Sequence, residues 1–277
     1  MSDTLVAVRD LQVAYRGEDG LVPALRGVSF TLGRERLGVV GESGSGKSTA
    51  GRALMGLLPA HAVVQASEMR LGTLDLRGLS ARGWRGVRGR RIAMILQDPK
   101  YALNPTMRVG AQIAEAYRLH GHRRRTRQAT LEMLEQVHIR DPTRVARLFP
   151  HEISGGMGQR VMIAMMLAGQ PEILIADEPT SALDVAVQRQ VLGLIDEMVR
   201  SRGMGLMLVS HNLRLVASFC DRVLVMYAGR VVETLAARDL SRAQHPYTRG
   251  LLAALPELGD RRDELPQLTR DPAWLAA

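Results

Sequence analysis

The spacing of hydrophobic residues along the chain changes from the period of strands to that of helices and back. Hydrophobic and polar residues alternate over residues 4–15 and again over 24–32, which predicts half-buried strands. Between residues 104 and 149 hydrophobic residues recur at helical spacing, as at Val109, Ile113 and Tyr117. The pattern predicts an antiparallel sheet near the N-terminus and a helical segment inserted farther along.

Several short hydrophobic runs, of the kind that buried strands have, each lead directly into polar residues. The runs are 37–40, 92–96, 173–176 and 206–209. They are followed in turn by a glycine-rich loop, by Gln97, by Asp177 and Glu178, and by His211. Because functional groups of parallel sheets lie at the carboxyl ends of the strands, we expect an α/β core with its site at that edge.

The glycine-rich loop fills the phosphate-binding pattern G-x-x-x-x-G-K-[ST] at every fixed position, between a predicted strand and a helix-compatible run. In such a loop, backbone N–H groups and the N-terminus of the following helix bind phosphate oxygens. Lys47, one of only two lysines in the chain, can reach the terminal phosphates, and the Ser48 hydroxyl can bind Mg²⁺. We expect a nucleoside triphosphate to bind here. The expected contacts are Gly41, Glu42, Ser43, Gly44, Ser45, Gly46, Lys47, Ser48 and Thr49.

Other residues are weaker signals when taken singly. Asp177 can hold Mg²⁺ and Glu178 can orient or deprotonate a water molecule, although an acidic turn after a strand is the plain structural alternative. Ser154 and two glycines precede a hydrophobic helix, predicted from about Gln159 to Leu167. They form a second anion-binding turn, but this tripeptide is common in loops. Tyr15 can stack on a nucleobase or simply pack. His211, at a strand end, is by default structural.

The composition of the chain indicates the class of protein and its cellular compartment. With 277 residues, 46% of them hydrophobic and 23% charged, the chain has the composition of a soluble globular protein. Its longest hydrophobic run, 161–169, is far shorter than the ~18–20 residues of a membrane span. The N-terminus lacks the pattern of a secretory signal, and Cys220 alone excludes an internal disulfide and a cysteine-built metal cluster. These features predict the cytosol.

The net charge of +9 leaves three interpretations open. Basic residues cluster at 82–91 and at 123–127, which could face nucleic acid, anionic lipid head groups or only water. Aromatic residues make up only 4% of the chain, and no stacking motif lies among these clusters. Charge alone does not decide between the three.

The order of the motifs carries more information than any one of them. Six motifs follow one another along the chain: the phosphate loop, Gln97, the Ser154 turn, Asp177 with Glu178, the run 181–184 and His211. This order resembles the ATP-binding subunit of ABC transporters, over nearly the whole chain. The resemblance implies an α/β P-loop NTPase core with an antiparallel β subdomain, an inserted α-helical subdomain and a short C-terminal extension. It implies an ATP-binding domain at 1–235, with the helical subdomain at about 104–165, and the extension at 236–277.

The resemblance also implies ligands and roles. ATP and Mg²⁺ are the cofactors; Tyr15 stacks on adenine, and Gly41 to Thr49 form the Walker A loop. The signature facing the partner's ATP is Ser154, Gly155, Gly156 and Met157. Asp184 communicates across the dimer. The general base is Glu178, assisted by Gln97 and His211, and the implied Mg²⁺ ligands are Ser48, Gln97 and Asp177.

Two segments indicate a subgroup. Residues 150–157 and 245–252 resemble importers of dipeptides, oligopeptides, nickel and opines. Met157 stands where the signature has a glutamine, a change that this group tolerates. Gly158 stands where the group usually has an arginine, and Asn212 replaces the usual aspartate. Cys220 alone cannot build the iron–sulphur site of some relatives. None of these departures removes a group needed for hydrolysis.

The implied partners are a second ATP-binding subunit, identical or related, two integral membrane permeases and an extracytoplasmic solute-binding protein. The chain would dimerise on ATP at the cytoplasmic face of the membrane and contact the permeases around residues 98–117. Peptides, nickel and opine-like solutes remain open as cargo. The alternative is an ABC-type ATPase acting on nucleic acid or the ribosome, which usually has two cassettes or a long coiled coil. A P-loop kinase or switch GTPase would leave the Ser154 turn and His211 unexplained.

Overall fold

The computed structural model describes residues 4–18, 20–121, 126–181, 183–254, 271 and 274. The basic residues 123–125, Ala182 and half of the predicted C-terminal extension (255–270, 272, 273 and 275–277) therefore lie outside the described residues. The chain divides into two units, which we call unit 1 (Met1–Leu79 and Met207–Ala277) and unit 2 (Ser80–Leu206). The domain boundaries predicted at 235 and at about 104–165 stay predictions.

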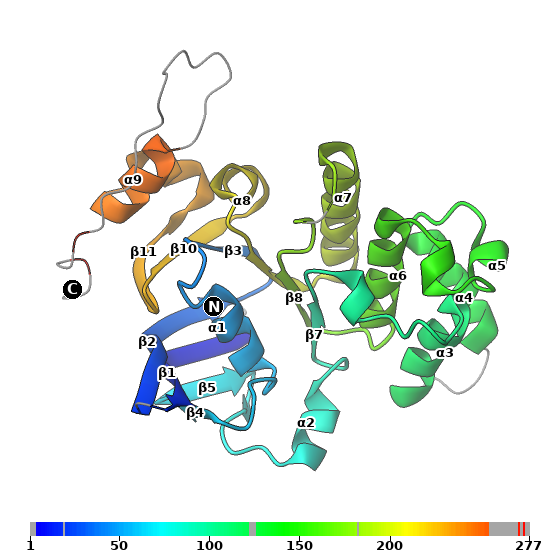
Figure 1. Cartoon of the computed structure of the whole chain (residues 1–277), viewed down its shortest axis with the longest axis horizontal. Helices are drawn as coiled ribbons and strands as arrows, with labels where there is room; N and C mark the ends of the chain where they lie inside the picture. The colour runs from blue at the N-terminus through cyan, green and yellow to red at the C-terminus, as the bar shows by residue number, and fades with distance from the viewer. Residues whose placement is uncertain are drawn as a thin grey trace. The chain divides into compact units, whose positions relative to one another are not determined.

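Unit 1 begins with the predicted antiparallel sheet. Strand β1 (Val6–Gly17) pairs with β2 (Gly20–Leu32), β4 (Ala62–Gln65) and β5 (Glu68–Leu71), and β5 pairs with β6 (Leu74–Asp75). Figure 1 shows β1 and β2 in blue.

A β-bulge interrupts the alternation along β1. The buried residues shift phase by one position between Val8 and Leu11, where the register with β2 also shifts. Asp10 takes a left-handed backbone (φ 49°), and its N–H donates to the Ser29 hydroxyl oxygen at 2.9 Å. The extra residue of the bulge keeps both halves of the strand facing the core.

The second sheet of unit 1 supports the phosphate loop. Strand β3 (Arg36–Val40) runs parallel to β10 (Arg222–Tyr227), which forms a hairpin with β11 (Arg230–Ala236). The helices of this unit are α1 (Lys47–Leu54), α8 (Leu213–Phe219), η3 (Ala237–Arg242) and α9 (Pro246–Ala253). Pro246 lies in the first turn of α9, where a missing N–H costs nothing, and so it separates this helix from η3.

Cys220 is buried where α8 ends against β3. A Cβ at Gly38 of β3 would lie 3.1 Å from the Cys220 Sγ, and burial raises the pKa of this thiol to about 12. Since the thiolate is the reactive form, we expect the native protein at pH 8 to react with Ellman's reagent at least ~100-fold more slowly than free cysteine. Reaction in guanidinium chloride should be fast. Rapid stoichiometric labelling of the native protein would contradict this burial.

Unit 2 contains parallel strands and most of the helices that the structure describes. Strands β7 (Ile92–Ile95) and β8 (Ile173–Asp177) pair in parallel, and β9 (Gly205–Val209) contains the division between the units. Around them lie α2 (Ala81–Val87), η1 (Pro99–Tyr101), α3 (Val109–Leu119), α4 (Thr126–Gln136), α5 (Pro142–Val145), η2 (Pro150–Glu152), α6 (Gly155–Leu167) and α7 (Val185–Arg202). The predicted helical segment is confirmed in α3, α4 and α5, drawn in green in Figure 1. Among the described helices, none has the length and hydrophobicity that crossing a membrane requires.

Helix α6 starts four residues earlier than predicted, at Gly155 rather than about Gln159. Glycines rarely favour a helix, but the Ser154 hydroxyl caps this one by accepting from the Met157 N–H at 3.3 Å. Farther along, α6 is buried on all sides, as its composition predicts.

Gly158 of α6 has room for a methyl group. An added Cβ would meet Pro99 at 3.5 Å and Leu103 at 3.8 Å, which are ordinary contacts. We expect Gly158→Ala to raise the free energy of unfolding by about 0.5–1 kcal/mol, since alanine has less backbone freedom to lose. The urea midpoint measures this. Gly156→Ala is the matched control, because its Cβ would lie 2.8 Å from the Val187 Cγ1 and should destabilise. Destabilisation by Gly158→Ala would contradict the packing described.

Candidate functional site

The phosphate loop of unit 1 lies between β3 and α1. Gly46 precedes α1 with a left-handed backbone (φ 98°), and a side chain there would collide with Leu25 Cδ2 at 2.6 Å. The Gly229 N–H donates to the Ser45 carbonyl oxygen at 3.1 Å, so the β10–β11 turn holds the far side of the loop. These contacts fix the backbone of the loop in a conformation suited to binding an anion.

Lys47 is buried in this loop, with 5% of its surface exposed. Its Nζ donates to the carbonyl oxygens of Gly41 at 2.8 Å and Glu42 at 2.7 Å. A buried ammonium needs such partners, and a phosphate oxygen would offer it a charged one. The lysine is therefore held beside the place where the sequence pattern predicts the terminal phosphates.

Tyr15 has an aromatic neighbour that the sequence did not predict. It pairs with Ala62 across β1 and β4, and its ring centroid lies 5.7 Å from that of His61, with the planes tilted by 51°. A nucleobase stacked on Tyr15 would therefore meet His61 as well. No spacing signal connects these residues, because their proximity depends on the β1–β4 register.

His211 follows β9 at the same edge as the phosphate loop in unit 1. The Ser210 N–H donates to the Val39 carbonyl oxygen at 3.1 Å, next to the residue that ends β3. Asn212 caps α8 by accepting from the Leu215 N–H at 3.1 Å. Asparagine and aspartate cap helices equally well, so the departure at Asn212 keeps the local structure. The His211 side chain is exposed at this edge.

In unit 2 the structure brings Gln97 and the two carboxylates to one edge. Ile95 of β7 is paired with Ala176 of β8, so both strands end at the same level and lead into Gln97 and into Asp177 and Glu178. Asp177 is 4% exposed, whereas Glu178 is half-buried.

Glu178 has a left-handed backbone (φ 48°), although it is not glycine and it precedes a proline. This conformation is unfavourable for such a residue, and local strain of this kind concentrates at functional sites. The backbone thus singles out Glu178 independently of the motif.

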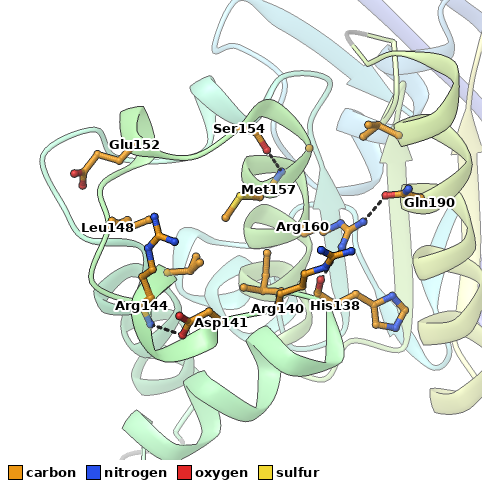
Figure 2. Close-up of a pocket in the computed structure, with 14 residues that line it drawn as sticks. His138, Arg140, Asp141, Arg144, Leu148, Glu152, Ser154, Met157, Arg160 and Gln190 are labelled. Atoms are coloured by element: carbon orange, nitrogen blue, oxygen red, sulfur yellow. Dashed lines mark hydrogen bonds between the residues drawn. The ribbon is translucent and has the colours of Figure 1, made fainter.

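The Ser154 turn opens beside a pocket of about 490 Å³ in unit 2 (Figure 2). Ser154, Gly156 and Met157 line one side, and Arg140, Arg144 and Arg160 line others. The Arg160 guanidinium donates to the His138 carbonyl oxygen at 2.7 Å and to Gln190 Oε1 at 2.8 Å. The signature residues predicted from sequence thus lie together at the N-terminus of α6, beside a pocket lined by these three arginines and by the carboxylates of Asp141 and Glu152.

Asp184 also has a structural role. It caps α7 by accepting from the Val187 N–H at 2.9 Å. The preceding loop is fastened by the Gln188 side chain, which donates to the carbonyl oxygens of Thr180 at 2.9 Å and Leu183 at 3.0 Å. Gln188 was not predicted, because a half-buried glutamine on a helix has no distinguishing sequence signal.

Residues 25–181 match the sequence profile of the family described as ABC transporter. The chain belongs to the ABC transporter family. An ABC transporter protein of this kind binds and hydrolyses ATP, and the comparisons give no support to the nucleic-acid alternative. Membership implies membrane permease partners and pairing of ATP-binding subunits.

The relatives of this ABC transporter protein match almost its full length. It is 47% identical over 273 residues to a probable peptide ABC transporter ATP-binding protein, y4tR, of Sinorhizobium fredii, which covers 96% of this chain and 82% of that protein. It is 44% identical to the dipeptide transport ATP-binding protein DppD of Bacillus subtilis, over 98% of this chain and 82% of that protein. It is 47% identical to the glutathione import ATP-binding protein GsiA of Escherichia coli O1:K1, over 92% of this chain, but spans only 42% of GsiA.

Solved structures confirm the fold class. The ATP-binding cassette MJ0796, solved as a dimer bound to ADP and Pi, is 24% identical, with a TM-score of 0.73 over 84% of this chain and 99% of that one. The protein cbiO1 of Clostridium perfringens, part of the ABC transporter complex cbiONQ, is 25% identical, with a TM-score of 0.72 over 87% of this chain and 92% of that one. The α/β P-loop NTPase fold is therefore confirmed.

Proposed function

We propose that the chain is the ATP-hydrolysing subunit of an importer for short peptides, bound to its permeases at the cytoplasmic face of the membrane. The support comes from the three relatives above, whose names give peptide, dipeptide and glutathione as what they transport or import. Nickel and opine-like solutes are the other cargoes of the resembled group. An extracytoplasmic solute-binding protein would deliver the peptide to the permeases.

The observation that carries the enzymatic part is the arrangement of polar groups at strand ends. In unit 1 the phosphate loop and His211 follow β3 and β9, and in unit 2 Gln97, Asp177 and Glu178 follow β7 and β8. In this proposal the phosphate loop binds ATP with Lys47 on its terminal phosphates, and Tyr15 packs on the adenine. Glu178 accepts a proton from the attacking water, which Gln97 and His211 help to position.

The oxygen donors Ser48, Gln97 and Asp177 fit Mg²⁺, which prefers hydroxyl, carbonyl and carboxylate ligands. Bound there, the ion would neutralise the charge of the phosphates. The residues of the chain do the rest: the loop amides and Lys47 orient the phosphates, and the buried Asp177 keeps its carboxylate fixed.

The Ser154 turn would complete the site of a second subunit. Its N–H groups at the start of α6 form the second anion-binding helix terminus that one triphosphate can share with the phosphate loop of a partner. Asp184 caps α7 in the same unit. In this proposal it couples the closure of the two ATP-binding subunits to the loop that precedes α7.

Uptake experiments test the cargo. In a strain that lacks this chain but retains its permeases, the wild-type chain is expected to restore uptake of a radiolabelled dipeptide or of glutathione. The Glu178→Gln variant should not restore it. If the wild-type chain restored uptake of nickel but of neither peptide, the peptide proposal would be wrong while the ATPase assignment stood.

A further inference from the structure

The C-terminal helix α9 contacts the phosphate loop through one side chain. Tyr247 is completely buried, and its hydroxyl oxygen accepts a hydrogen bond from the Glu42 N–H at 3.0 Å. The two residues are 205 positions apart in sequence. Figure 1 shows α9 in orange beside β10 and β11. A residue of the C-terminal region therefore forms part of the environment of the phosphate loop.

The hydrogen bond fixes a particular peptide group. The Glu42 N–H and the Gly41 carbonyl belong to the same planar peptide unit. Tyr247 accepts from its N–H, and Lys47 Nζ donates to its carbonyl oxygen at 2.8 Å. One peptide is thus held from both sides, by the tyrosine of α9 and by the lysine that the nucleotide requires.

The Gly41–Glu42 peptide follows a glycine and can therefore adopt more than one orientation. Gly41 has φ 152°, and a Cβ on it would lie 2.1 Å from the Met226 carbonyl oxygen, so only glycine fits against β10. Glycine also permits the alternative orientations of the adjoining peptide that a side chain would forbid. A partner on the Glu42 N–H selects one of them.

Tyr247 is itself firmly held. Its ring centroid lies 4.6 Å from that of Tyr227 in β10 and 5.9 Å from that of Trp274. The Tyr247 N–H donates to His245 Nδ1 at 3.1 Å, and His245 thereby caps α9. The His245 N–H in turn donates to the Glu233 carboxylate of β11 at 3.3 Å. The Tyr247 hydroxyl that contacts the phosphate loop therefore belongs to a side chain fixed in a packed aromatic cluster.

We propose that Tyr247 is a positioning residue for ATP binding: its hydroxyl holds the Gly41–Glu42 peptide, and through it Lys47, in the orientation that receives the phosphates. The proposal rests on the assignment of Gly41 to Thr49 as the ATP loop. It gives α9 a function in the ATP site of its own chain.

Tyr247→Phe removes the hydroxyl and keeps the ring. When the tyrosine hydroxyl is removed, the Glu42 N–H is stabilised by rotating toward water. The nucleotide-free loop then populates peptide orientations that do not bind phosphate, and returning to the binding orientation lowers the apparent affinity for ATP. We expect the Kd for ADP and the KM for ATP to rise about tenfold, while kcat stays within about twofold, since the bound loop is restored. Calorimetric titration with ADP and steady-state hydrolysis measure the two effects. Exchange of the Glu42 amide with deuterium should also be faster in the variant.

Tyr227→Phe is the matched control, because it removes a hydroxyl from the same aromatic cluster and leaves the Gly41–Glu42 peptide untouched. It should bind ADP like the wild type. The Lys47→Ala variant tests separately the assignment of Gly41 to Thr49 as the ATP loop. If this variant binds ADP and ATP as the wild type does, that assignment is wrong. The Tyr247 proposal is overturned if Tyr247→Phe changes the Kd for ADP by less than twofold, with Glu42 exchange unchanged. A drop in kcat at constant KM overturns it as well.

Discussion

Replacement of Glu178 by glutamine is expected to leave ATP binding unchanged and to lower ATP turnover by roughly 10²–10⁴-fold, the usual contribution of a general base. Glutamine has the size of glutamate but cannot accept the proton of the attacking water at neutral pH. The strained backbone at Glu178 is retained, because the change affects only the end of the side chain. Single-turnover hydrolysis and ATP titration measure the two quantities separately.

The control for this experiment is Glu115→Gln, which removes an exposed carboxylate from α3 in the same unit. It should hydrolyse ATP at the wild-type rate. A Glu178→Gln variant with wild-type turnover would falsify the assignment of the general base. Loss of ATP binding in that variant would contradict it too, because it would give Glu178 a role in binding.

Replacement of Ser154 by arginine is the second change with a large expected effect. It removes the hydroxyl that caps α6 and places a long side chain at the anion-binding turn beside the pocket of Figure 2. We expect turnover to fall at least about 100-fold, the usual cost of losing preorganised donors to a developing charge. Binding of ATP to the phosphate loop of the same chain should remain, because that loop belongs to unit 1.

The contrast with Lys47→Ala makes this prediction specific. That variant should lose ATP binding, whereas Ser154→Arg should lose only turnover, and both should melt within a few degrees of the wild type. Equal loss of ATP binding in the two variants would contradict the idea that the Ser154 turn serves a different nucleotide from the one held by Lys47.

Much of the fold followed from local patterns. The strands of unit 1, the hairpin after Arg222 and the helix that ends at Gly203 have hydrophobic periods and terminal residues that specify them without tertiary information. The phosphate loop is equally local, because its function depends on consecutive backbone groups. Such elements can be predicted because neighbouring residues determine them.

What the sequence did not predict depends on contacts between distant segments. His61 reaches Tyr15 only through the pairing of β1 with β4, and Tyr247 reaches Glu42 only because α9 packs beside β10. The bulge at Asp10 and the early start of α6 were missed for a related reason. In both, a side-chain hydrogen bond outweighs the local propensity.

In the proposed function, one chain holds only half of a hydrolytic site, so that turnover requires two chains. The direct test is the specific ATPase activity of the purified protein, alone and with its cognate second ATPase where that differs, over a dilution series at saturating ATP and Mg²⁺. We predict that specific activity falls toward zero as the protein becomes monomeric and rises with the fraction of paired chains. A specific activity that stays constant down to fully monomeric protein would contradict the claim.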